Sequence, residues 1–320
     1  MFDRVIEIIN SCSTFLITSH IRPDGDALGS ELAIYHLLRD MGKEAVVYNQ
    51  DKTPIIYEFL PGSSNIIHSL NSVNGFDAAF VLDCSDIERV GDENDRIGSV
   101  KQIINIDHHV SVGTFSDILI LDSTASSTGE IIHRLLKYMG ATISEEIATN
   151  IYTAILTDTG SFRYSNTGSN TFAAAADLVE NGANCRYIAE KIYETRSAVQ
   201  IRLMGKTLET LELFAGGKIG FICISQKTLR REGALPEHTE GFVDIVRSIQ
   251  GIEIAICCYE VSKDRFKVSL RSKGNVDVEQ IAARLGGGGH INASACRING
   301  DIKAVKTAVL NVIETVYKAL

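Results

Sequence analysis

The hydrophobic positions in the first half of the chain fall into short apolar runs that alternate with longer, helically spaced stretches. Five runs have the length of strands, at residues 14–20, 44–49, 78–86, 101–109 and 116–124. Apolar residues recur with helical spacing over residues 27–42, 126–140 and 144–160. The first of these stretches ends at Gly42, and glycine commonly stops helices. Apolar strands that alternate with helices predict a parallel sheet with helices on both faces.

The pattern changes towards the end of the chain. Three helical stretches occupy about residues 168–213, and the last, over 197–214, is typical of a connector. Strand-like runs at 216–225, 251–261 and 264–273 then alternate with short helices, and a final helix is expected over 304–320. These patterns predict an α/β chain of three parts. They are a parallel-sheet domain over 1–190, a helical connector over 191–213 and a smaller α/β domain over 214–320.

The composition is that of an ordinary globular protein. The chain has 320 residues, of which 45% are hydrophobic and 22% charged, and this length favours two domains. No apolar run approaches the roughly 20 residues that a membrane-spanning helix needs. The amino-terminal residues lack the layout of a signal peptide, and seven cysteines without a CxxC pair suit a reducing compartment. We therefore expect a cytoplasmic protein without a membrane partner.

The charge argues against one class of nucleic-acid-binding protein. The formal net charge is −9 at pH 7, whereas proteins that coat long nucleic acids non-specifically need a basic surface. Residues 214–320 hold 15 Lys and Arg against 11 Asp and Glu, and residues 1–213 hold 16 against 29. An acidic first part suits cations, and a mildly basic last part suits anions.

Acids and imidazoles stand where three of the predicted strands end. They are His20, Asp24 and Asp26 after the first strand, Asp83 at the end of the third, and Asp107, His108 and His109 at the end of the fourth. Asp158 closes the helix over 144–160. Ligands of an open parallel sheet bind outside the carboxyl ends of its strands, so we expect these side chains to meet at one edge.

Four carboxylates in one small site would repel one another unless cations offset their charge. The four are Asp24, Asp26, Asp83 and Asp158. Two divalent cations would bring the sum to neutral, with His20 and His108 completing the coordination. Oxygen-rich ligation with imidazole favours Mn²⁺, with Mg²⁺ or Co²⁺ as substitutes, and the lack of sulfur ligands argues against a structural zinc. Paired cations clamp a phosphoryl group and activate water, which predicts phosphoester chemistry.

The same stretches carry a resemblance to a known family. “HIRPDGDALGS” at 20–30, “VLDCSD” at 81–86, “NIDHHVS” at 105–111 and “TDTGSFRYSNT” at 157–167 resemble, in order, the motifs of the DHH phosphoesterase superfamily. “VSLRSKG” at 268–274 followed by “RLGGGGHINASA” at 284–295 resembles the DHHA1 substrate-binding domain. Within that superfamily the chain is most similar to the bifunctional nanoRNase/pAp phosphatases. The resemblance implies hydrolysis of short oligoribonucleotides and linear dinucleotides, and removal of the 3′-phosphate from 3′-phosphoadenosine 5′-phosphate (pAp).

The resemblance also implies roles for individual residues. One cation would be held by His20, Asp24 and Asp83, and the other by Asp26, Asp83, His108 and Asp158, with Asp83 bridging the two. Asp107 would orient a histidine, and His109 would face the substrate phosphate as a hydrogen-bond donor or acid. Arg163 is a candidate contact for the phosphate or the leaving group. A supporting imidazole at His109 and a solvated surface arginine at Arg163 are the structural alternatives.

The last part of the chain holds the expected substrate-binding residues. Four consecutive glycines present backbone amides that can cradle an anion, and Ser269, Arg271 and His290 would add donors. The glycines are Gly286, Gly287, Gly288 and Gly289. A flexible glycine-rich loop without a ligand is the alternative. The family usually has glycine where this chain has Ala295, a difference that bears on the shape of the nucleotide pocket.

Several readings remain open from the sequence. A family II inorganic pyrophosphatase shares the metal motifs, and a RecJ-type exonuclease shares them on a longer, more basic chain. An RNA-binding regulatory module would keep the fold without the chemistry. The expected partner is a short RNA or a nucleotide, and a homodimer is a further hypothesis. “SSTGE” at 126–130 is interpreted as a helix N-cap, with a phosphate contact as the alternative.

Overall fold

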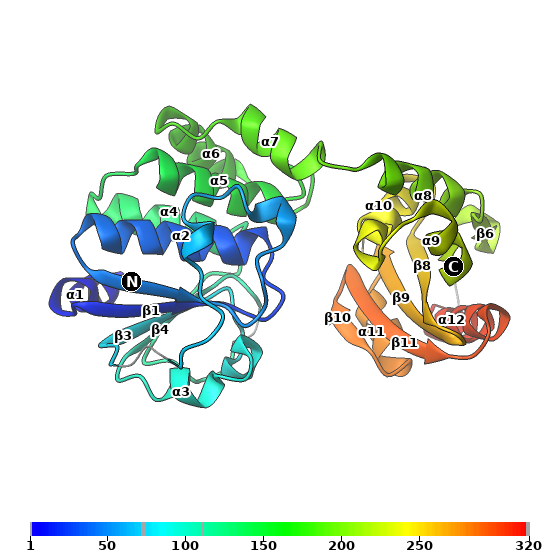
Figure 1. Cartoon of the computed structure of the whole chain (residues 1–320), viewed down its shortest axis with the longest axis horizontal. Helices are drawn as coiled ribbons and strands as arrows, with labels where there is room; N and C mark the ends of the chain where they lie inside the picture. The colour runs from blue at the N-terminus through cyan, green and yellow to red at the C-terminus, as the bar shows by residue number, and fades with distance from the viewer. Residues whose placement is uncertain (1, 72–74, 111, 275, 318–320) are drawn as a thin grey trace. The chain divides into compact units, whose positions relative to one another are not determined.

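The chain folds into two compact units, residues 1–195 and 196–320 (Figure 1). The computed structural model describes residues 2–71, 75–110, 112–274 and 276–317, and for His290 the backbone alone. Each unit is an α/β structure with its own sheet and its own hydrophobic core. The predicted fold class is therefore confirmed. A separate connector over 191–213 stays a prediction.

The first unit is built on a five-stranded sheet in which every neighbouring pair is parallel. The strands are β1 (Thr14–Thr18), β2 (Glu44–Tyr48), β3 (Ala78–Leu82), β4 (Ile103–Asp107) and β5 (Ile118–Leu121), in the order β2-β1-β3-β4-β5. Along β1, Phe15 and Ile17 enter one core, whereas Leu16 enters another on the opposite face. Because both faces are buried, the strands read as continuous apolar runs, as predicted.

Helices cover the two faces of this sheet unequally. They are α1 (Asp3–Ser11), α2 (Gly25–Asp40), α3 (Asn94–Gly98), α4 (Thr128–Met139), α5 (Glu145–Asp158), α6 (Ser169–Glu180) and α7 (Cys185–Tyr193). Figure 1 shows α2, α4 and α5 stacked on one side of the sheet and the short α3 on the other. The larger core lies under the stacked helices. The smaller core, which includes Val90 and Ile97, lies on the side of α3.

The second unit contains a six-stranded mixed sheet in the order β10-β11-β9-β8-β7-β6. Its strands are β6 (Glu212–Phe214), β7 (Ile219–Ile224), β8 (Ile254–Ser262), β9 (Arg265–Ser272), β10 (Gly288–His290) and β11 (Ala293–Asn299). Only β7 and β8 pair in parallel. Its helices are α8 (Ala198–Leu208), α9 (Gln226–Glu232), α10 (Phe242–Ser248), α11 (Val278–Arg284) and α12 (Ile302–Val316).

Two differences from the sequence-based expectations concern this unit. The helix expected over 197–214 ends at Leu208, and Glu212–Phe214 forms β6, because these residues pair with β7 instead of extending the helix. Strands β10 and β11 were not predicted. The final helix is present from Ile302 to Val316, and the end of the predicted range, residues 318–320, lies outside the described residues.

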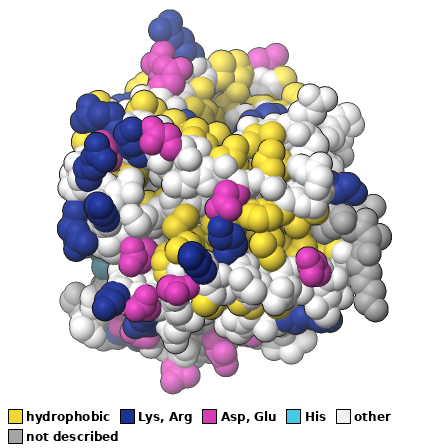
Figure 2. Space-filling view, turned by 90° about the vertical axis from the view of Figure 1, so that its right-hand side faces the viewer, with side chains coloured by type: hydrophobic (Ala, Val, Ile, Leu, Met, Phe, Trp, Pro, Cys, Tyr) yellow, Lys and Arg dark blue, Asp and Glu magenta, His cyan; other side chains and the backbone are white. Residues whose placement is uncertain are grey.

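The charged side chains of the second unit carry both signs. Figure 2 shows one face of the molecule on which acidic side chains lie among basic ones and hydrophobic side chains cross the middle. On the face shown, the excess of Lys and Arg in residues 214–320 does not gather into one continuous basic surface. The face shown therefore lacks the continuous basic surface that non-specific coating of a long nucleic acid needs.

A test of the packing in the first unit is the substitution Gly29→Ala in α2. A Cβ at this position would collide with the carbonyl oxygen of Asn150 and lie 3.0 Å from the Cβ of Ala154, so α2 and α5 would have to separate. We expect the unfolding free energy of the first unit to fall by about 1–3 kcal/mol. Gly205→Ala in α8 is the matched control, because its Cβ meets nothing within 4 Å. Amide hydrogen exchange, which reads each unit separately, would contradict the packing argument if both variants behaved alike.

Candidate metal centre

The polar residues predicted at the strand ends come together at one edge of the first sheet. Strands β1, β3 and β4 are neighbours, so the segments that follow them leave the sheet side by side. Asp24 is the N-cap of α2, and Asp26 lies in the first turn of that helix. Asp158 is the last residue of α5, which packs against α2. The expected convergence of these side chains is found.

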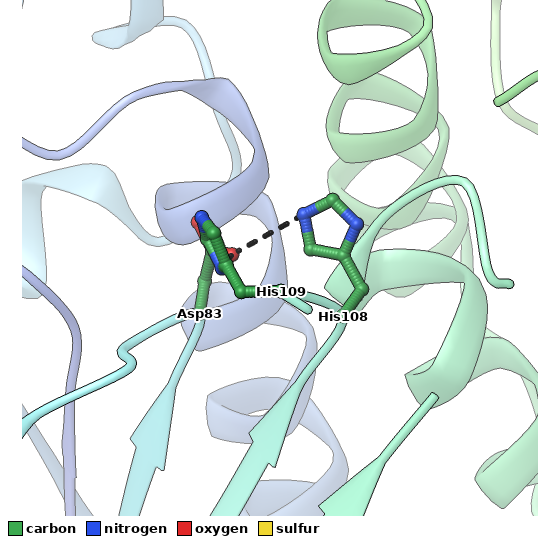
Figure 3. A group of neighbouring side chains, drawn as sticks. All are labelled: Asp83, His108 and His109. Atoms are coloured by element: carbon green, nitrogen blue, oxygen red, sulfur yellow. Dashed lines mark ion pairs between the residues drawn. The ribbon is translucent and has the colours of Figure 1, made fainter. Parts of the chain in front are cut away.

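His108 lies at the centre of three carboxylates. Its Nε2 is 3.7 Å from Asp26 Oδ2, 3.6 Å from Asp83 Oδ1 and 3.7 Å from Asp158 Oδ2. Figure 3 shows the imidazole of His108 directed towards Asp83. These separations are too long for hydrogen bonds, but they suit ligands that each lie about 2.0–2.2 Å from a shared cation. Of the side chains around His108, Asp83 and His109 form a group with it whose ligand atoms all lie within 4.8 Å of one another, as a shared cation requires.

A second group shares Asp83 with the first. Ligand atoms of His20, Asp24 and Asp83 all lie within 4.8 Å of one another, and His20 Nε2 is 3.4 Å from Asp83 Oδ2. His20 Nδ1 lies 2.8 Å from the carbonyl oxygen of Ile21, which can only accept a hydrogen bond, so Nδ1 carries the proton. In the neutral ring this leaves the lone pair on Nε2, the atom that faces Asp83. The tautomer of His20 thus suits a metal ligand.

Asp83 is held in an unusual backbone conformation. Its φ of 50° is left-handed, which a non-glycine residue adopts only when its surroundings hold it there. Its N–H donates to the carbonyl oxygen of Ile106 at 3.0 Å, and its side chain is almost fully buried. These contacts direct the Asp83 carboxylate to a position between both groups of ligand atoms.

Asp107 is hydrogen-bonded to His109, whereas the resemblance implied only that Asp107 orients a histidine. The buried Asp107 Oδ1 accepts hydrogen bonds from His109 Nδ1 at 2.7 Å and from the His109 backbone N–H at 3.0 Å. His109 Nδ1 also lies 3.6 Å from Asp83 Oδ1, and this geometry adds His109 to the side chains that could hold a cation. The hydrogen bond to Asp107 already engages Nδ1.

The protonation equilibria show that the centre is short of positive charge. Burial opposes protonation of His20, but the interaction with Asp83 and the charge of Asp24 outweigh it and raise the pKa of His20 to about 9. Burial also opposes ionisation of Asp83, yet His20 and His109 lower its pKa to about 2. Burial and the charge of Asp83 raise the pKa of Asp26 well above its ordinary value. Loss of hydration raises the pKa of Asp158 to about 6. A bound cation would favour the ionised carboxylates.

The N-terminus of α4 supports two of these carboxylates. Ser127 Oγ accepts a hydrogen bond from the Glu130 backbone N–H, so the predicted N-cap is confirmed. The backbone N–H groups of Thr128 and Gly129 donate to the two oxygens of Asp26 at 2.8 and 2.9 Å. The hydroxyl of Thr128 donates to Asp83 Oδ1 at 3.2 Å. From the sequence this segment was interpreted as an N-cap, and its hydrogen bonds to the two carboxylates were not predicted. The Ser-Thr pair was the nearest signal for them.

Two buried glutamates behind the centre were also missed. Glu130 accepts hydrogen bonds from the hydroxyls of Ser126 at 2.6 Å and Thr171 at 2.9 Å, and so connects the start of α4 to α6. Glu31 accepts from Asn49 Nδ2 at 2.8 Å, and burial raises its pKa to about 8. Their only sequence signal is a carboxylate at an otherwise apolar helix position.

Arg163 lies in a left-handed turn after α5. Its Nε donates to the carbonyl oxygen of Gly160 at 2.5 Å, and the residue is exposed. Within the described part of the chain, Arg163 makes no ion pair with the carboxylates of the centre. Its role towards a phosphate or leaving group stays a prediction.

The glycine run of the second unit is part of a sheet. Gly286 is left-handed (φ 75°), and Gly288–His290 forms β10, which pairs with β11. A Cβ at Gly287 would meet the carbonyl oxygen of Ala295 and lie 2.6 Å from Cys296 Cβ, so this backbone approach requires glycine. Gly288 and Gly289 therefore lie in a strand, whereas Gly286 and Gly287 precede it.

The other expected substrate-binding residues lie on or beside the same strands. In register, Ser269 on β9 is opposite Ala295, which is opposite Gly288 on β10. Arg271 Nη1 donates to the Leu270 carbonyl oxygen at 3.1 Å, and its Nε lies 3.8 Å from Asp244 Oδ1. The side chain of His290 lies outside the described residues. Ala295 therefore lies between Ser269 and Gly288 in this row of paired residues, at a position where the family usually has glycine.

The sequence matches known families over both units. Residues 14–156 match the DHH family, N-terminal domain, and residues 221–319 match the DHHA1 domain. A bifunctional oligoribonuclease and PAP phosphatase NrnA of Thermus thermophilus is 31% identical over 89% of this chain and 84% of its own length. The chain therefore belongs to the DHH family of phosphoesterases, as its motifs predicted.

Further relatives extend this similarity. The Bacillus subtilis bifunctional oligoribonuclease and PAP phosphatase NrnA is 28% identical over 93% of each chain. A crystal structure of an exopolyphosphatase-related protein from Bacteroides fragilis superposes with a TM-score of 0.94, 29% identity and coverage of 99% of this chain and 96% of its own. RecJ from Thermus thermophilus, solved with Mn²⁺, shares only the fold, with a TM-score of 0.54 and 12% identity over 99% of this chain and 54% of its own. In the described ranges, no helix is long and apolar enough to cross a membrane.

The contact between Thr128 and Asp83 can be tested by Thr128→Val, which keeps the branched shape but removes the hydroxyl. Asp83 loses a contact that orients it, so we expect the affinity for Mn²⁺, the probe cation, to fall about 10-fold. Isothermal titration calorimetry on the full chain measures this affinity. Thr128→Ser keeps the hydroxyl and should bind as the unsubstituted chain does. Equal affinities of the Val and Ser variants would contradict the orienting role.

Proposed function

We propose that this chain hydrolyses short oligoribonucleotides, including linear dinucleotides, and removes the 3′-phosphate from pAp. The observation that carries the proposal is the sharing of Asp83 between two groups of ligand atoms, one around His108 and one around His20. The curated relatives named as oligoribonuclease and PAP phosphatase, which match most of the chain, support the choice of substrates.

In this proposal two divalent cations occupy the centre. The first is held by His20, Asp24 and Asp83, and the second by Asp26, Asp83, His108 and Asp158. The oxygen-rich ligand set with one imidazole per ion favours Mn²⁺ over Mg²⁺ or Co²⁺. When bound, such a pair polarises a phosphoryl group and lowers the pKa of water. The residues of the chain then have to orient the substrate and move protons.

His109 is the proposed proton donor or hydrogen-bond donor to the phosphate. Asp107 fixes the orientation of the ring through Nδ1, and the negative charge of this buried carboxylate favours the protonated imidazole. Consistent with this, the hydrogen bond with Asp107 raises the pKa of His109. A raised pKa favours the protonated imidazole, which can give its proton to a leaving oxygen.

The second unit supplies the proposed nucleotide-binding residues. Backbone amides of the run over 286–289, together with Ser269, Arg271 and His290, bind a phosphate or base of the substrate in this proposal. The register that sets Ser269, Ala295 and Gly288 in one row supports it, because a compact group of donors forms on neighbouring strands. Compared with a glycine at this position, the methyl group of Ala295 leaves less space for a substrate beside these paired residues.

The remaining alternatives are less well supported. A family II pyrophosphatase or a RecJ-type exonuclease has no counterpart among the full-length relatives named above, and RecJ is similar in fold alone. An RNA-binding regulatory module would not need ligand atoms at every expected position. A cytoplasmic location and a homodimer stay predictions.

A substrate panel tests the proposal. With Mn²⁺ present, we expect a ribodinucleotide and pAp to be hydrolysed at least about 100-fold faster, in kcat/KM, than pyrophosphate or a long single strand. Asp83→Ala should abolish both favoured activities, because the carboxylate serves both cations. Asp40→Ala, at the exposed end of α2, is the matched control and should keep them. Faster turnover of pyrophosphate, or an active Asp83→Ala variant, would refute the assignment.

A second experiment addresses the second unit. Arg271→Ala should raise KM for a ribodinucleotide about 10-fold and leave kcat/KM for the small activated diester bis-p-nitrophenyl phosphate unchanged, because only the longer substrate reaches a nucleotide-binding residue. Arg297→Ala, exposed on the neighbouring strand β11, is the control. Equal losses on both substrates would contradict a substrate-holding role for Arg271.

A further inference from the structure

The metal centre is rich in carboxylates, yet the proposed substrate is itself an anion. Asp24, Asp26, Asp83 and Asp158 contribute four acidic side chains, and Asp107 lies directly behind His109. Cations held by these groups neutralise them but leave little positive charge for the non-bridging oxygens of a phosphate. A fixed cationic side chain at the same edge of the sheet would supply it.

Arg89 is such a side chain, and the sequence interpretation did not single it out. It lies in the 3₁₀ helix Ile87–Val90, six residues after Asp83. Its backbone carbonyl oxygen accepts a hydrogen bond from the N–H of Ile21 at 2.7 Å, and Ile21 directly follows His20. Arg89 therefore connects the segment after β3 to the segment after β1, the two segments that carry the ligand atoms around Asp83.

The guanidinium group of Arg89 is held in place without being neutralised. Its Nη1 donates to Ser85 Oγ at 3.1 Å, and the Ser85 carbonyl oxygen accepts from the N–H of Gly113, in the segment after β4, at 2.7 Å. Arg89 is half-buried. Among the described residues, no carboxylate lies within ion-pair distance of it, whereas Arg134 pairs with Asp122 at 2.7 Å. A half-buried guanidinium without an ion-pair partner keeps N–H donors from which the oxygens of a bound anion can accept hydrogen bonds.

We infer that Arg89 binds a phosphate oxygen of the nucleotide at the metal centre. This inference rests on the proposed function, since it assigns a further substrate-binding residue to the same site. The planar guanidinium can donate two parallel hydrogen bonds to one phosphate, and it has five N–H groups, one of which is engaged by Ser85. Arg163, the arginine expected from the sequence, instead donates Nε to its own turn.

Arg89→Met tests the inference, because methionine keeps much of the apolar stem but removes the charge. With Mn²⁺ present, we expect KM for a ribodinucleotide and the dissociation constant of AMP to rise by about 10- to 100-fold. Affinity for Mn²⁺ alone should stay within 3-fold of that of the unsubstituted chain. For Arg89→Lys, KM and the dissociation constant of AMP should lie between those of Arg89→Met and of the unsubstituted chain. Lysine keeps the charge but lacks the bidentate geometry. Arg186→Met, on an arginine whose side chain is 86% exposed, is the matched control.

The affinities for AMP and Mn²⁺ distinguish a failure of this inference from a failure of the proposed function. Unchanged AMP affinity in Arg89→Met, or a loss of Mn²⁺ affinity equal to the loss of AMP affinity, would overturn the inference, because the arginine would then be structural. AMP binding needs no turnover. An Arg89-dependent AMP affinity in a chain that hydrolyses no oligoribonucleotide would therefore refute the proposed function and leave the inference standing.

Discussion

Repulsion among carboxylates is the constraint around which the first unit is arranged. Oxygen atoms of Asp26, Asp83 and Asp158 lie 3.6–3.7 Å from the imidazole of His108. Such a group of carboxylates is stable only if positive charge or donated hydrogen bonds offset its negative charge. The amides that begin α4 stabilise Asp26 directly, and the partial positive charge of that helix end acts in the same sense. In the proposed function, bound cations offset the remaining negative charge of the carboxylates.

The sequence predicted the first sheet well because its strands are buried on both faces. Residues 78–82 are all buried, and a run of this kind has few alternatives besides a central strand. The sequence predicted the second sheet less well. Strand β10 consists of two glycines and a histidine, and β11 alternates small and polar residues, so neither has a hydrophobic pattern. Strand β11 forms because it pairs with β9, and β10 forms because it pairs with β11, so these strands depend on backbone partners that leave no local signal.

The side chains of the candidate metal centre stand out in the sequence, whereas what holds them in place does not. Acids and imidazoles at strand ends are visible in a sequence, since their chemistry lies in the side chain. The support of Asp26 comes from backbone N–H groups more than 100 positions away, and every residue except proline has one. The left-handed backbone of Asp83 and the buried hydrogen-bond partners of Glu130 likewise leave no recognisable pattern in the sequence. Only the assembled structure shows them.

The long separation between Asp26 and the start of α4 has a consequence for how the chain matures. A polypeptide emerging from the ribosome presents residues 20–83 well before residues 128–158, so the first acidic groups appear without the amides and the last carboxylate that complete the centre. In the proposed function, the second cation, which Asp158 helps to hold, would therefore bind tightly only after α5 has been released. Occupancy of that proposed second site would accordingly report that residues 20–158 have reached their native topology, and loss of its cation would loosen contacts across this stretch.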